Sequence, residues 1–325
     1  MPRLCVIPGD GIGQEVVPAA VRVLRAAIPN LETIEAEAGW DCFQRQGVSV
    51  PEATLATIRE CGVALFGAVS SPSYRVAGYR SAILTMRQAL DLYANVRPVQ
   101  SWPNVSPRPG IDMIIVRENT EGLYAGRERL EGDTAVAERI ITRQASRRIA
   151  QKALDLSRQL GRQRLTIVHK ANVLPLTDGL FRDTVRQVVG DALAVDELLV
   201  DVAALKMVAE PERFDVVVTT NLFGDILSDA AAHWGGGLGL APSLNWGDGL
   251  AVAEPVHGSA PDIAGQGLAN PIAAILSGAL LARFVWGDEQ GAARVETAVH
   301  QTLAHNYPLT GTQAITEAVL RRLAY

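Results

Sequence analysis

Short apolar runs alternate with longer amphipathic stretches along most of the chain. Five runs rich in Val, Ile and Leu predict buried strands, namely Leu4–Pro8, Val63–Phe66, Ile111–Val116, Leu165–Val168 and Asp215–Thr219. Between them lie helical patterns such as Ala145–Leu160, in which apolar residues recur at Ile149, Ala153, Leu156 and Leu160. Alternating strands and helices predict an α/β architecture with a largely parallel sheet.

Two segments interrupt this alternation and predict crossings between domains. Ser101–Gly110 concentrates three prolines just before a predicted strand, and Gly235–Gly249 is rich in glycine. The first domain would then be discontinuous, built from residues 1–99 together with 250–325, and the second would span 100–249. A charged stretch with weak periodicity, at about residues 124–140, predicts a protruding arm.

Composition narrows the class of protein. A length of 325 residues suggests two domains at about 150 residues each. Apolar residues make up 48% and charged residues 20%, which argues against intrinsic disorder. The net charge of -5 argues against a general nucleic-acid binder. No apolar run suits a signal peptide or a membrane span, and the three cysteines form no CxxC pair, so we expect a cytoplasmic protein with reduced thiols.

Candidate chemistry follows the predicted strands, because ligands of open α/β sheets bind beyond the carboxyl ends of the strands. Charged or glycine-rich residues follow each run: Gly9–Gly13, Gly67, Arg117–Asn119, His169–Asn172, and Asn221 with Gly224 and Asp225. The first of these, GDGIG, fails the GxGxxG fingerprint in both registers, because Gln14 or Val16 stands where the last glycine belongs. It predicts a tight strand-to-helix turn rather than a GxGxxG Rossmann domain.

The segment NLFGDILSD carries two acidic residues four positions apart. On a helix, Asp225 and Asp229 would share one face, and two such carboxylates repel unless a cation or an arginine lies between them. Carboxylate oxygens favour Mg²⁺ or Mn²⁺. A solvated helix face is the alternative, but the apolar residues around the pair favour a metal site. Asp201, after another apolar run, is a third candidate ligand.

Three arginines and two proton-transfer groups complete the candidate site. Arg87, Arg97 and Arg117 suit a substrate with several carboxylates, although each alone is compatible with a surface ion pair. Tyr124 and Lys170 are candidates for proton transfer, and cations or a metal nearby would lower the pKa of the lysine. The histidines show no HExxH-type spacing, which argues against zinc.

Six long motifs, in order along almost the whole chain, carry a family resemblance. They are PGDGIGQEVVP, LDLYANVRP, VRENTEGLY, HKANVL, TTNLFGDILSD and EPVHGSAPDIAGQGLANP. The chain resembles the metal-dependent β-decarboxylating dehydrogenases, which include the isocitrate, 3-isopropylmalate, homoisocitrate and tartrate dehydrogenases. Within that family it is most similar to the bacterial homoisocitrate dehydrogenases of lysine biosynthesis.

The resemblance implies an isocitrate/isopropylmalate dehydrogenase-like fold with a dimerisation arm, and a homodimer or dimer of dimers whose active sites are shared between subunits. The implied cofactors are NAD and Mg²⁺ or Mn²⁺. By the matching motifs, substrate carboxylates are held by Arg87, Arg97 and Arg117, with Asn172 also in the substrate site. Tyr124 and Lys170 are the catalytic pair. The metal ligands are Asp201, Asp225 and Asp229, and Lys170 and Asp201 come from the partner subunit.

The implied cofactor contacts are Ile12, His257, Gly258, Ser259, Ala260, Asp262, Ile263 and Asn270. Relatives that use NADP carry Lys-Tyr where this chain has Asp262 and Ile263. A carboxylate there would repel a 2′-phosphate, so NAD is favoured. The segment 307–312 is shorter than in the family, and its cofactor contacts are not carried over.

Residues ahead of Arg87 bear on the substrate. Spacing predicts that Arg80, Ile83 and Leu84 share a helix face with Arg87. Arg80 and Ser81 suit a third carboxylate, whereas Ile83 and Leu84 suit an aliphatic group. Isopropylmalate enzymes usually have Glu at the position of Arg80, but bacterial homoisocitrate enzymes have Arg at the position of Leu84.

We therefore expect NAD-dependent oxidative decarboxylation of homoisocitrate to 2-oxoadipate and CO₂. Isocitrate and 3-isopropylmalate remain alternative substrates. A non-catalytic regulatory subunit is disfavoured because the full set of catalytic and metal-ligating candidates is present. A phosphoryl-transfer enzyme is disfavoured because the chain has no GxxxxGK[ST] loop.

Overall fold

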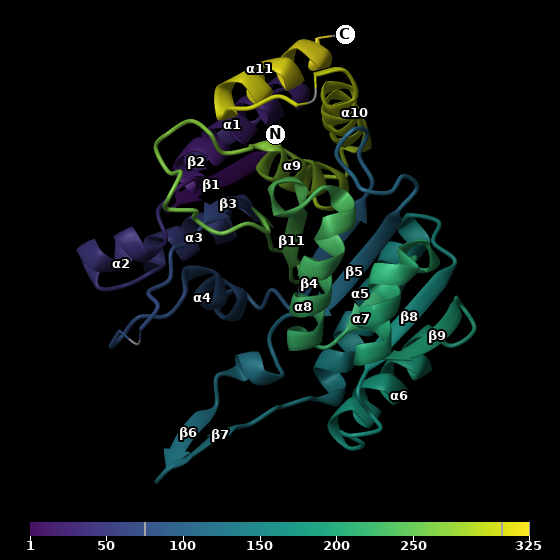
Figure 1. Cartoon of the computed structure of the whole chain (residues 1–325). Helices are drawn as coiled ribbons and strands as arrows, with labels where there is room; N and C mark the ends of the chain where they lie inside the picture. Colours follow the sequence, from purple (N-terminus) through teal and green to yellow (C-terminus); the bar gives the residue numbers. More distant parts are fainter. Residues whose placement is uncertain (75, 307, 325) are drawn as a thin grey trace. The chain divides into compact units, whose positions relative to one another are not determined.

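Two compact units make up the computed structural model of the chain, which describes residues 1–74, 76–306 and 308–324 (Figure 1). The first unit comprises Met1–Leu92, Ser101–Pro109 and Gly235–Tyr325, and the second comprises Tyr93–Gln100 and Gly110–Trp234. The units assign residues 93–99, 101–109 and 235–249 differently from the predicted domain ranges, 1–99 with 250–325 and 100–249. Those ranges stay a prediction.

The first unit has five strands in the order β2, β1, β3, β12, β11. The pairs from β2 to β12 are parallel, and β11 is antiparallel to β12. The strands span Arg3–Gly9 (β1), Glu32–Glu35 (β2), Val63–Ala68 (β3), Pro242–Trp246 (β11) and Ala251–Pro255 (β12). The helices are α1 (Gly13–Ala27), α2 (Trp40–Gln46), α3 (Glu52–Cys61), α4 (Ala82–Ala89), α9 (Ile272–Phe284), α10 (Glu289–Asn306) and α11 (Thr312–Leu323), with a 3₁₀ turn at Leu238–Leu240.

Helix α9 lies at the centre of the first unit. It is apolar on all sides, and every residue from Ile272 to Ala282 is buried, as expected for a core helix. It packs against α1, α10 and the strands β11 and β12. Gly278 allows a close approach to α1, because a Cβ there would lie 2.4 Å from Leu24 Cδ1.

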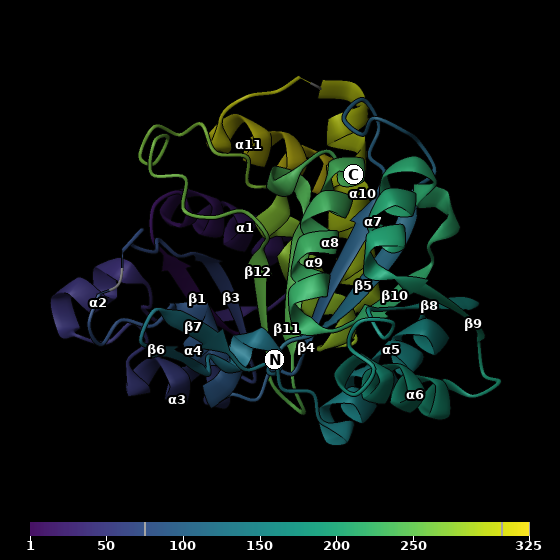
Figure 2. The same cartoon turned by 60° about the horizontal axis from the view of Figure 1, so that its bottom comes forward.

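The second unit also has five strands, in the order β4, β5, β10, β8, β9. Only the β4–β5 pair is antiparallel. The strands span Ala94–Gln100 (β4), Asp112–Glu118 (β5), Arg164–His169 (β8), Ala194–Leu199 (β9) and Val216–Thr219 (β10). The helices are α5 (Arg143–Gln159), α6 (Thr177–Val189), α7 (Val200–Ala209) and α8 (Asn221–Ala232), with 3₁₀ turns at Leu123–Ala125 and Pro211–Arg213. A further 3₁₀ turn, His233–Gly235, ends at the first residue of the last segment of the first unit. Helices α5 and α6 pack together, as do α7 and α8, and Figure 2 shows the two pairs on opposite faces of the strands.

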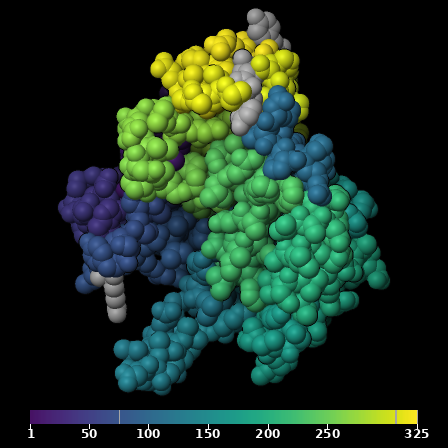
Figure 3. Space-filling model, in the orientation of Figure 1, coloured from purple at the N-terminus to yellow at the C-terminus, as the bar shows by residue number. Residues whose placement is uncertain are grey.

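A two-stranded hairpin extends from the second unit. Its strands β6 (Glu128–Glu131) and β7 (Thr134–Ala137) are antiparallel and mostly exposed, and Figures 1 and 3 show them reaching away from the helices of that unit. A backbone bridge between Gly122 and Ile140 closes the base of the hairpin. The predicted protruding arm is therefore confirmed.

The α/β fold with a largely parallel sheet is confirmed, and all five predicted strands and the helix predicted at Ala145–Leu160 are present. Among the described residues, seven further strands were not predicted: β2, β4, β6, β7, β9, β11 and β12. Within β4, Arg97 and Pro98 break the apolar run. The strand β11 lies in the segment interpreted as a glycine-rich crossing. Across the described parts of the chain, no helix has the length and apolar character that crossing a membrane requires.

A substitution in the GDGIG turn can test how closely the backbone is packed in the first unit. A Cβ on Gly13, the first residue of α1, would lie 2.0 Å from the Pro8 carbonyl oxygen and 3.0 Å from the Ala68 amide nitrogen. We expect Gly13→Ala to lower the free energy of unfolding by about 1–3 kcal/mol or more, because backbone atoms must move. Gly179→Ala in α6, where a Cβ meets nothing within 4 Å, is the matched control. Chemical denaturation of both variants measures the difference, and equal stabilities would contradict this account of the turn.

Candidate active site

Two arginines and two aspartates meet beside α8. Asp225 and Asp229 lie one turn apart on this helix, as predicted. Arg97 of β4 donates from one guanidinium nitrogen to Asp229 Oδ1 at 2.7 Å and from another to Asp225 Oδ1 at 3.4 Å. Arg117 of β5 forms an ion pair with Asp225. Together with Tyr124, these side chains form what we call the arginine–aspartate cluster.

The arginines of the cluster are buried and held in fixed orientations. The side chain of Arg117 is 1% exposed, and its Nε and Nη2 donate to Asn221 Oδ1 at 3.1 and 2.8 Å. Gly224 makes room for it, because a Cβ there would lie 2.6 Å from Arg117 Cγ. Arg97 donates to Asn95 Oδ1 at 2.8 Å and to Ser228 Oγ at 2.7 Å. A guanidinium group that is held in a fixed orientation is well suited to bind a carboxylate through two parallel hydrogen bonds.

Tyr124 joins the cluster from the 3₁₀ turn at the base of the arm. Its hydroxyl donates to Asp225 Oδ2, and the Arg117 guanidinium carbon lies 5.0 Å from the centre of its ring. Burial raises the pKa of the Tyr124 phenol, and the Asp225 carboxylate raises it further. The phenol therefore holds its proton at neutral pH, as a proton donor must.

The two aspartates are a fitting pair of ligands for a hard cation. Burial raises the pKa of Asp229, and the repulsion from Asp225 adds to this effect, while Arg97 opposes it. Mg²⁺ is commonly held by one or two carboxylates together with substrate oxygens and water. Among the described residues, no three acidic, His or Cys side chains gather into a metal-binding group. The chain by itself thus brings together two of the three predicted metal ligands.

The third predicted ligand pairs with the second predicted catalytic group. Lys170, directly after β8, donates from Nζ to Asp201 Oδ1 on α7. This hydrogen bond lowers the pKa of Asp201. Asn172 lies in the turn that follows Lys170, between the lysine and the start of α6. The resemblance places Lys170 and Asp201 in the partner's active site, which stays a prediction.

Arg87 is anchored in the first unit. From α4 it donates through Nε to Asn245 Oδ1 at 2.9 Å and through Nη2 to Glu254 Oε1 at 3.1 Å. Asn245 also donates to Glu254 Oε1 at 2.8 Å, so each of the three side chains contacts the other two. The sequence reasoning named neither Asn245 nor Glu254, although Glu254 opens one of the family motifs.

The predicted helix face ahead of Arg87 is wrong for Arg80. Helix α4 begins at Ala82, and Ser81 precedes it with an extended backbone (ψ 134°). Arg80 therefore lies outside the helix, and its side chain is exposed. Ile83 and Leu84 are in α4 and half-buried, so the aliphatic part of the prediction keeps its place on the helix.

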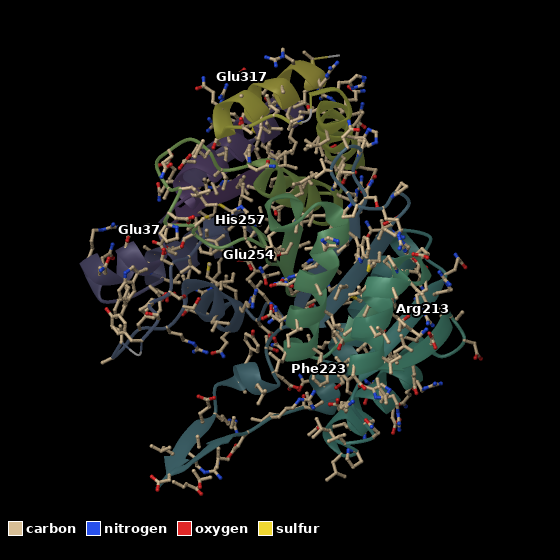
Figure 4. The ribbon with its side chains drawn as sticks, viewed as in Figure 1. Glu37, Arg213, Phe223, Glu254, His257 and Glu317 are labelled. Atoms are coloured by element: carbon tan, nitrogen blue, oxygen red, sulfur yellow. The ribbon has the colours of Figure 1, made fainter. Side chains whose placement is uncertain are left out.

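The predicted cofactor residues gather where the GDGIG turn meets the loop after β12. The amide of Ile12 donates to the Ser259 carbonyl at 2.9 Å, and Ser70 Oγ donates to Ser259 Oγ at 2.8 Å. A Cβ on Gly11 would lie 2.2 Å from that same carbonyl oxygen, so the contact requires glycine. His257 Nε2 is buried and has no hydrogen-bond partner among the described residues, and burial lowers the pKa of the ring. A neutral imidazole with an unused nitrogen fits a polar cofactor; Figure 4 shows it near Glu254.

The rest of that loop turns back towards α9. Ala260 has a positive φ of 39°, which is strained for a residue with a Cβ and is frequent at binding sites. Asp262 is exposed, and the Ile263 amide donates to the Ala260 carbonyl at 3.1 Å. Asn270 accepts from the Ile272 amide at 3.0 Å and lines a small pocket with Leu240 and Leu303, among others. Gly258 is exposed within the loop, and Tyr307 of the shortened segment lies outside the described residues.

Comparison with known proteins shows the family to which the chain belongs. The family model described as isocitrate/isopropylmalate dehydrogenase matches residues 3–319. The chain belongs to that family. It is 54% identical over 329 residues to the isocitrate/homoisocitrate dehydrogenase of Thermus thermophilus, which covers 99% of this chain and 98% of that protein.

Other members carry different substrate names. The 3-isopropylmalate dehydrogenase of Methanothermobacter thermautotrophicus is 47% identical over 305 residues, covering 93% of this chain and 91% of the relative. The crystal structure of isocitrate dehydrogenase from Methylococcus capsulatus superposes with a TM-score of 0.95 at 40% identity, covering 100% of both chains. The family comprises β-decarboxylating hydroxy-acid dehydrogenases that generally use NAD(P) and Mg²⁺ or Mn²⁺.

Asn221, which accepts from Arg117, is a position at which anion binding by Arg117 can be tested. An Asp at that position would place a carboxylate against Arg117, compete for its guanidinium and repel an incoming carboxylate. We expect Asn221→Asp to weaken binding of a small dicarboxylate such as malate by about 10-fold or more, since close charges at an effective dielectric of about 20 interact by several kcal/mol. Calorimetry with Mg²⁺ measures the affinity, and Asn30→Asp, at an exposed asparagine, controls for added charge. Unchanged affinity would show that Arg117 does not bind the anion.

Proposed function

We propose that the chain catalyses the NAD-dependent oxidative decarboxylation of homoisocitrate to 2-oxoadipate and CO₂. The observation that supports the proposal is the arginine–aspartate cluster, in which two buried arginines, two carboxylates and a tyrosine hydroxyl meet. The choice of substrate rests on the Thermus thermophilus relative, which is named for isocitrate and homoisocitrate. The three cysteines are all free, which supports the expected cytoplasmic compartment.

The chain's own residues have separate tasks in this proposal. In the second unit, Arg97 and Arg117 bind substrate carboxylates, and Asp225 and Asp229 would hold the metal. The family motif assigns carboxylate binding to Arg87 as well. When bound, Mg²⁺ or Mn²⁺ supplies Lewis-acid chemistry at the substrate hydroxyl and carbonyl oxygens, and NAD⁺ accepts the hydride. Lys170 takes the proton of the substrate hydroxyl. After CO₂ has left, Tyr124 donates its phenolic proton to the substrate carbon.

NAD rather than NADP is proposed from the loop after β12. Asp262 is exposed there. A carboxylate at this position accepts hydrogen bonds from ribose hydroxyls and repels a 2′-phosphate.

We propose a homodimer whose two active sites are shared. Family members are typically homodimers. Apolar side chains stand exposed on two neighbouring helices: Leu205 is 68% and Val208 62% exposed on α7, and Ile226 is 59% exposed on α8. Covering such a patch favours association with a second copy. An arrangement of this kind would supply each arginine–aspartate cluster with the Lys170 and Asp201 of the partner.

A parallel measurement of kcat/KM for homoisocitrate, isocitrate and 3-isopropylmalate, with NAD⁺ and Mg²⁺, tests the substrate. We expect homoisocitrate to be highest, and isocitrate to be the nearer competitor, since one methylene in a pocket changes the barrier by only about 1–3 kcal/mol. A higher kcat/KM for 3-isopropylmalate would overturn the assignment.

Leu84 is the position at which the substrate pocket can be tested directly. Leu84→Arg adds a guanidinium for the third carboxylate and removes aliphatic contact. We expect it to raise the ratio of kcat/KM for homoisocitrate over 3-isopropylmalate by about 10-fold or more, in the range of a charge-assisted hydrogen bond. Leu84→Met, which keeps an apolar side chain of similar size, is the control. No change in the ratio with Arg would show that Leu84 does not line the pocket.

Mixed dimers test the shared site. Lys170→Met and Tyr124→Phe homodimers each lack one catalytic group in both sites. In a mixed dimer of the two variants, one site combines the Tyr124 of the Lys170→Met subunit with the Lys170 of the Tyr124→Phe subunit. We expect that dimer to regain about half of the wild-type kcat, because one of its two sites is complete. Tagged subunits purified in sequence give the dimer, and activity no higher than that of the homodimers would refute sharing.

A further inference from the structure

Arg139 stands at the point where the arm returns to the second unit. It follows β7 and precedes α5, and its side chain is 16% exposed. Its guanidinium pairs with Asp178 and donates to Thr177 Oγ1 at 2.9 Å, both in the first turn of α6. Its other terminal nitrogen donates to Thr220 Oγ1 at 3.0 Å, just before α8. None of the functions assigned above uses this arginine.

The partner of Arg139 is a fully buried carboxylate. The side chain of Asp178 is 0% exposed. One of its oxygens pairs with Arg139, and the other accepts from the backbone amide of Lys170 at 2.6 Å. A buried carboxylate without a counter-charge is strongly unfavourable, and Arg139 supplies the counter-charge of Asp178. The carboxylate in turn fixes the backbone from which the Lys170 side chain extends.

The arginine is also packed on α8. Its guanidinium carbon lies 5.2 Å from the centre of the Phe223 ring, which Figure 4 marks at the end of α8 near the base of the arm. A cation over an aromatic face is held in a defined orientation. Two further contacts fix the same region: Glu121 accepts from the Thr142 amide at 2.8 Å, and Gly122 bridges Ile140. The arm therefore has a rigid base at which Arg139 has little freedom.

We propose that Arg139 and Asp178 are positioning residues that hold Lys170 in its catalytic orientation and tie that orientation to the base of the arm. The proposal rests on the proposed function, because it assumes that Lys170 accepts the substrate proton. Arg139 touches no substrate and acts through Asp178 on the Lys170 backbone. Loss of the pair lets the lysine backbone move while the arginine–aspartate cluster keeps its own contacts.

Kinetics of the full-length enzyme, with its best substrate, NAD⁺ and Mg²⁺, test the proposal. We expect Arg139→Met to lower kcat by about 10- to 100-fold, as small displacements of a catalytic group do. The KM for the hydroxy acid should stay within about twofold, since the cluster still binds it. Arg139→Lys, which keeps the charge beside Asp178, should retain at least half of kcat. The control Arg129→Met removes another arm arginine, one that pairs with the exposed Glu131 and Glu138, and should leave kcat unchanged.

A kinetic isotope effect gives a readout that a merely structural role would not move. With deuterium on the hydroxyl-bearing carbon, the effect on kcat should be larger in Arg139→Met than in wild type, because the oxidation step becomes limiting. If Arg139→Met fails to fold, the double variant Arg139→Met/Asp178→Asn removes both buried charges together and should show the same loss of kcat. A raised KM at unchanged kcat, or no rescue by lysine, would overturn the proposal.

Mixed dimers then separate action through Lys170 from action through α8. In the Lys170→Met and Tyr124→Phe mixed dimer, the complete site takes its lysine from the Tyr124→Phe subunit. Arg139→Met should abolish most activity when placed in that subunit and little when placed in the other. The reverse pattern would mean that Arg139 acts through Thr220 and Phe223, and would overturn the proposal. An inactive parental mixed dimer would instead contradict the shared site, and the homodimer kinetics would still decide the role of Arg139.

Discussion

The repulsion between two carboxylates on one helical turn is the constraint on which the site depends. Asp225 and Asp229 lie on the same face of α8, and Arg97 and Arg117 lie against them. Each pair requires the other: two buried guanidinium groups are costly without nearby anions, and the two aspartates repel each other without nearby cations. The four charges sum to zero. Under the proposed function, substrate carboxylates would bind the arginines and a divalent cation would be held by the aspartates, so each ligand would replace the counter-charge that the other pair supplies here.

The fold creates this constraint through strand register. In the antiparallel β4–β5 pair, Asn95 lies opposite Arg117, and Arg97 lies opposite Ile115. Arg97 and Arg117 are therefore diagonal neighbours on one face of the pair, since residues two apart on a strand share a face. The strand β10 lies directly beside β5 and leads into α8, which brings the aspartates to the same end. The small residues Gly224 and Ser228 on α8 then leave room for, and bond to, the two guanidinium groups.

Much of this site follows from the sequence, for a physical reason in each case. The strands β5, β8 and β10 are buried on both faces and so are continuous apolar runs, which is why the pattern located the ends of these strands. The helical spacing of Asp225 and Asp229 was correct because nothing interrupts α8. Arg80 was misplaced because the start of α4 is set by the extended backbone of Ser81, which periodicity does not reveal.

No local sequence pattern identifies the hydrogen-bond partners of the charged groups. Asn221 lies 104 positions from Arg117 in the chain, and Asn245 lies 158 positions from Arg87. Such contacts depend on strand order, which a single sequence does not contain. The same holds for Asp178, whose buried carboxylate looks in the sequence like an ordinary acidic residue in the first turn of a helix.

The base of the arm holds residues that the proposed dimer assigns to two different active sites. Tyr124 lies at the start of the arm, just after Gly122 of the Gly122–Ile140 bridge, and Arg139 lies at its end, just before Ile140. The arm thus separates a residue of the subunit's own cluster from a residue that holds Lys170, which the proposed dimer assigns to the partner's cluster. A displacement of the arm would move Tyr124 in one site and Lys170 in the other at the same time. In a dimer that shares its sites, the base of each arm would therefore contribute to both active sites, through Tyr124 in one and through the support of Lys170 in the other.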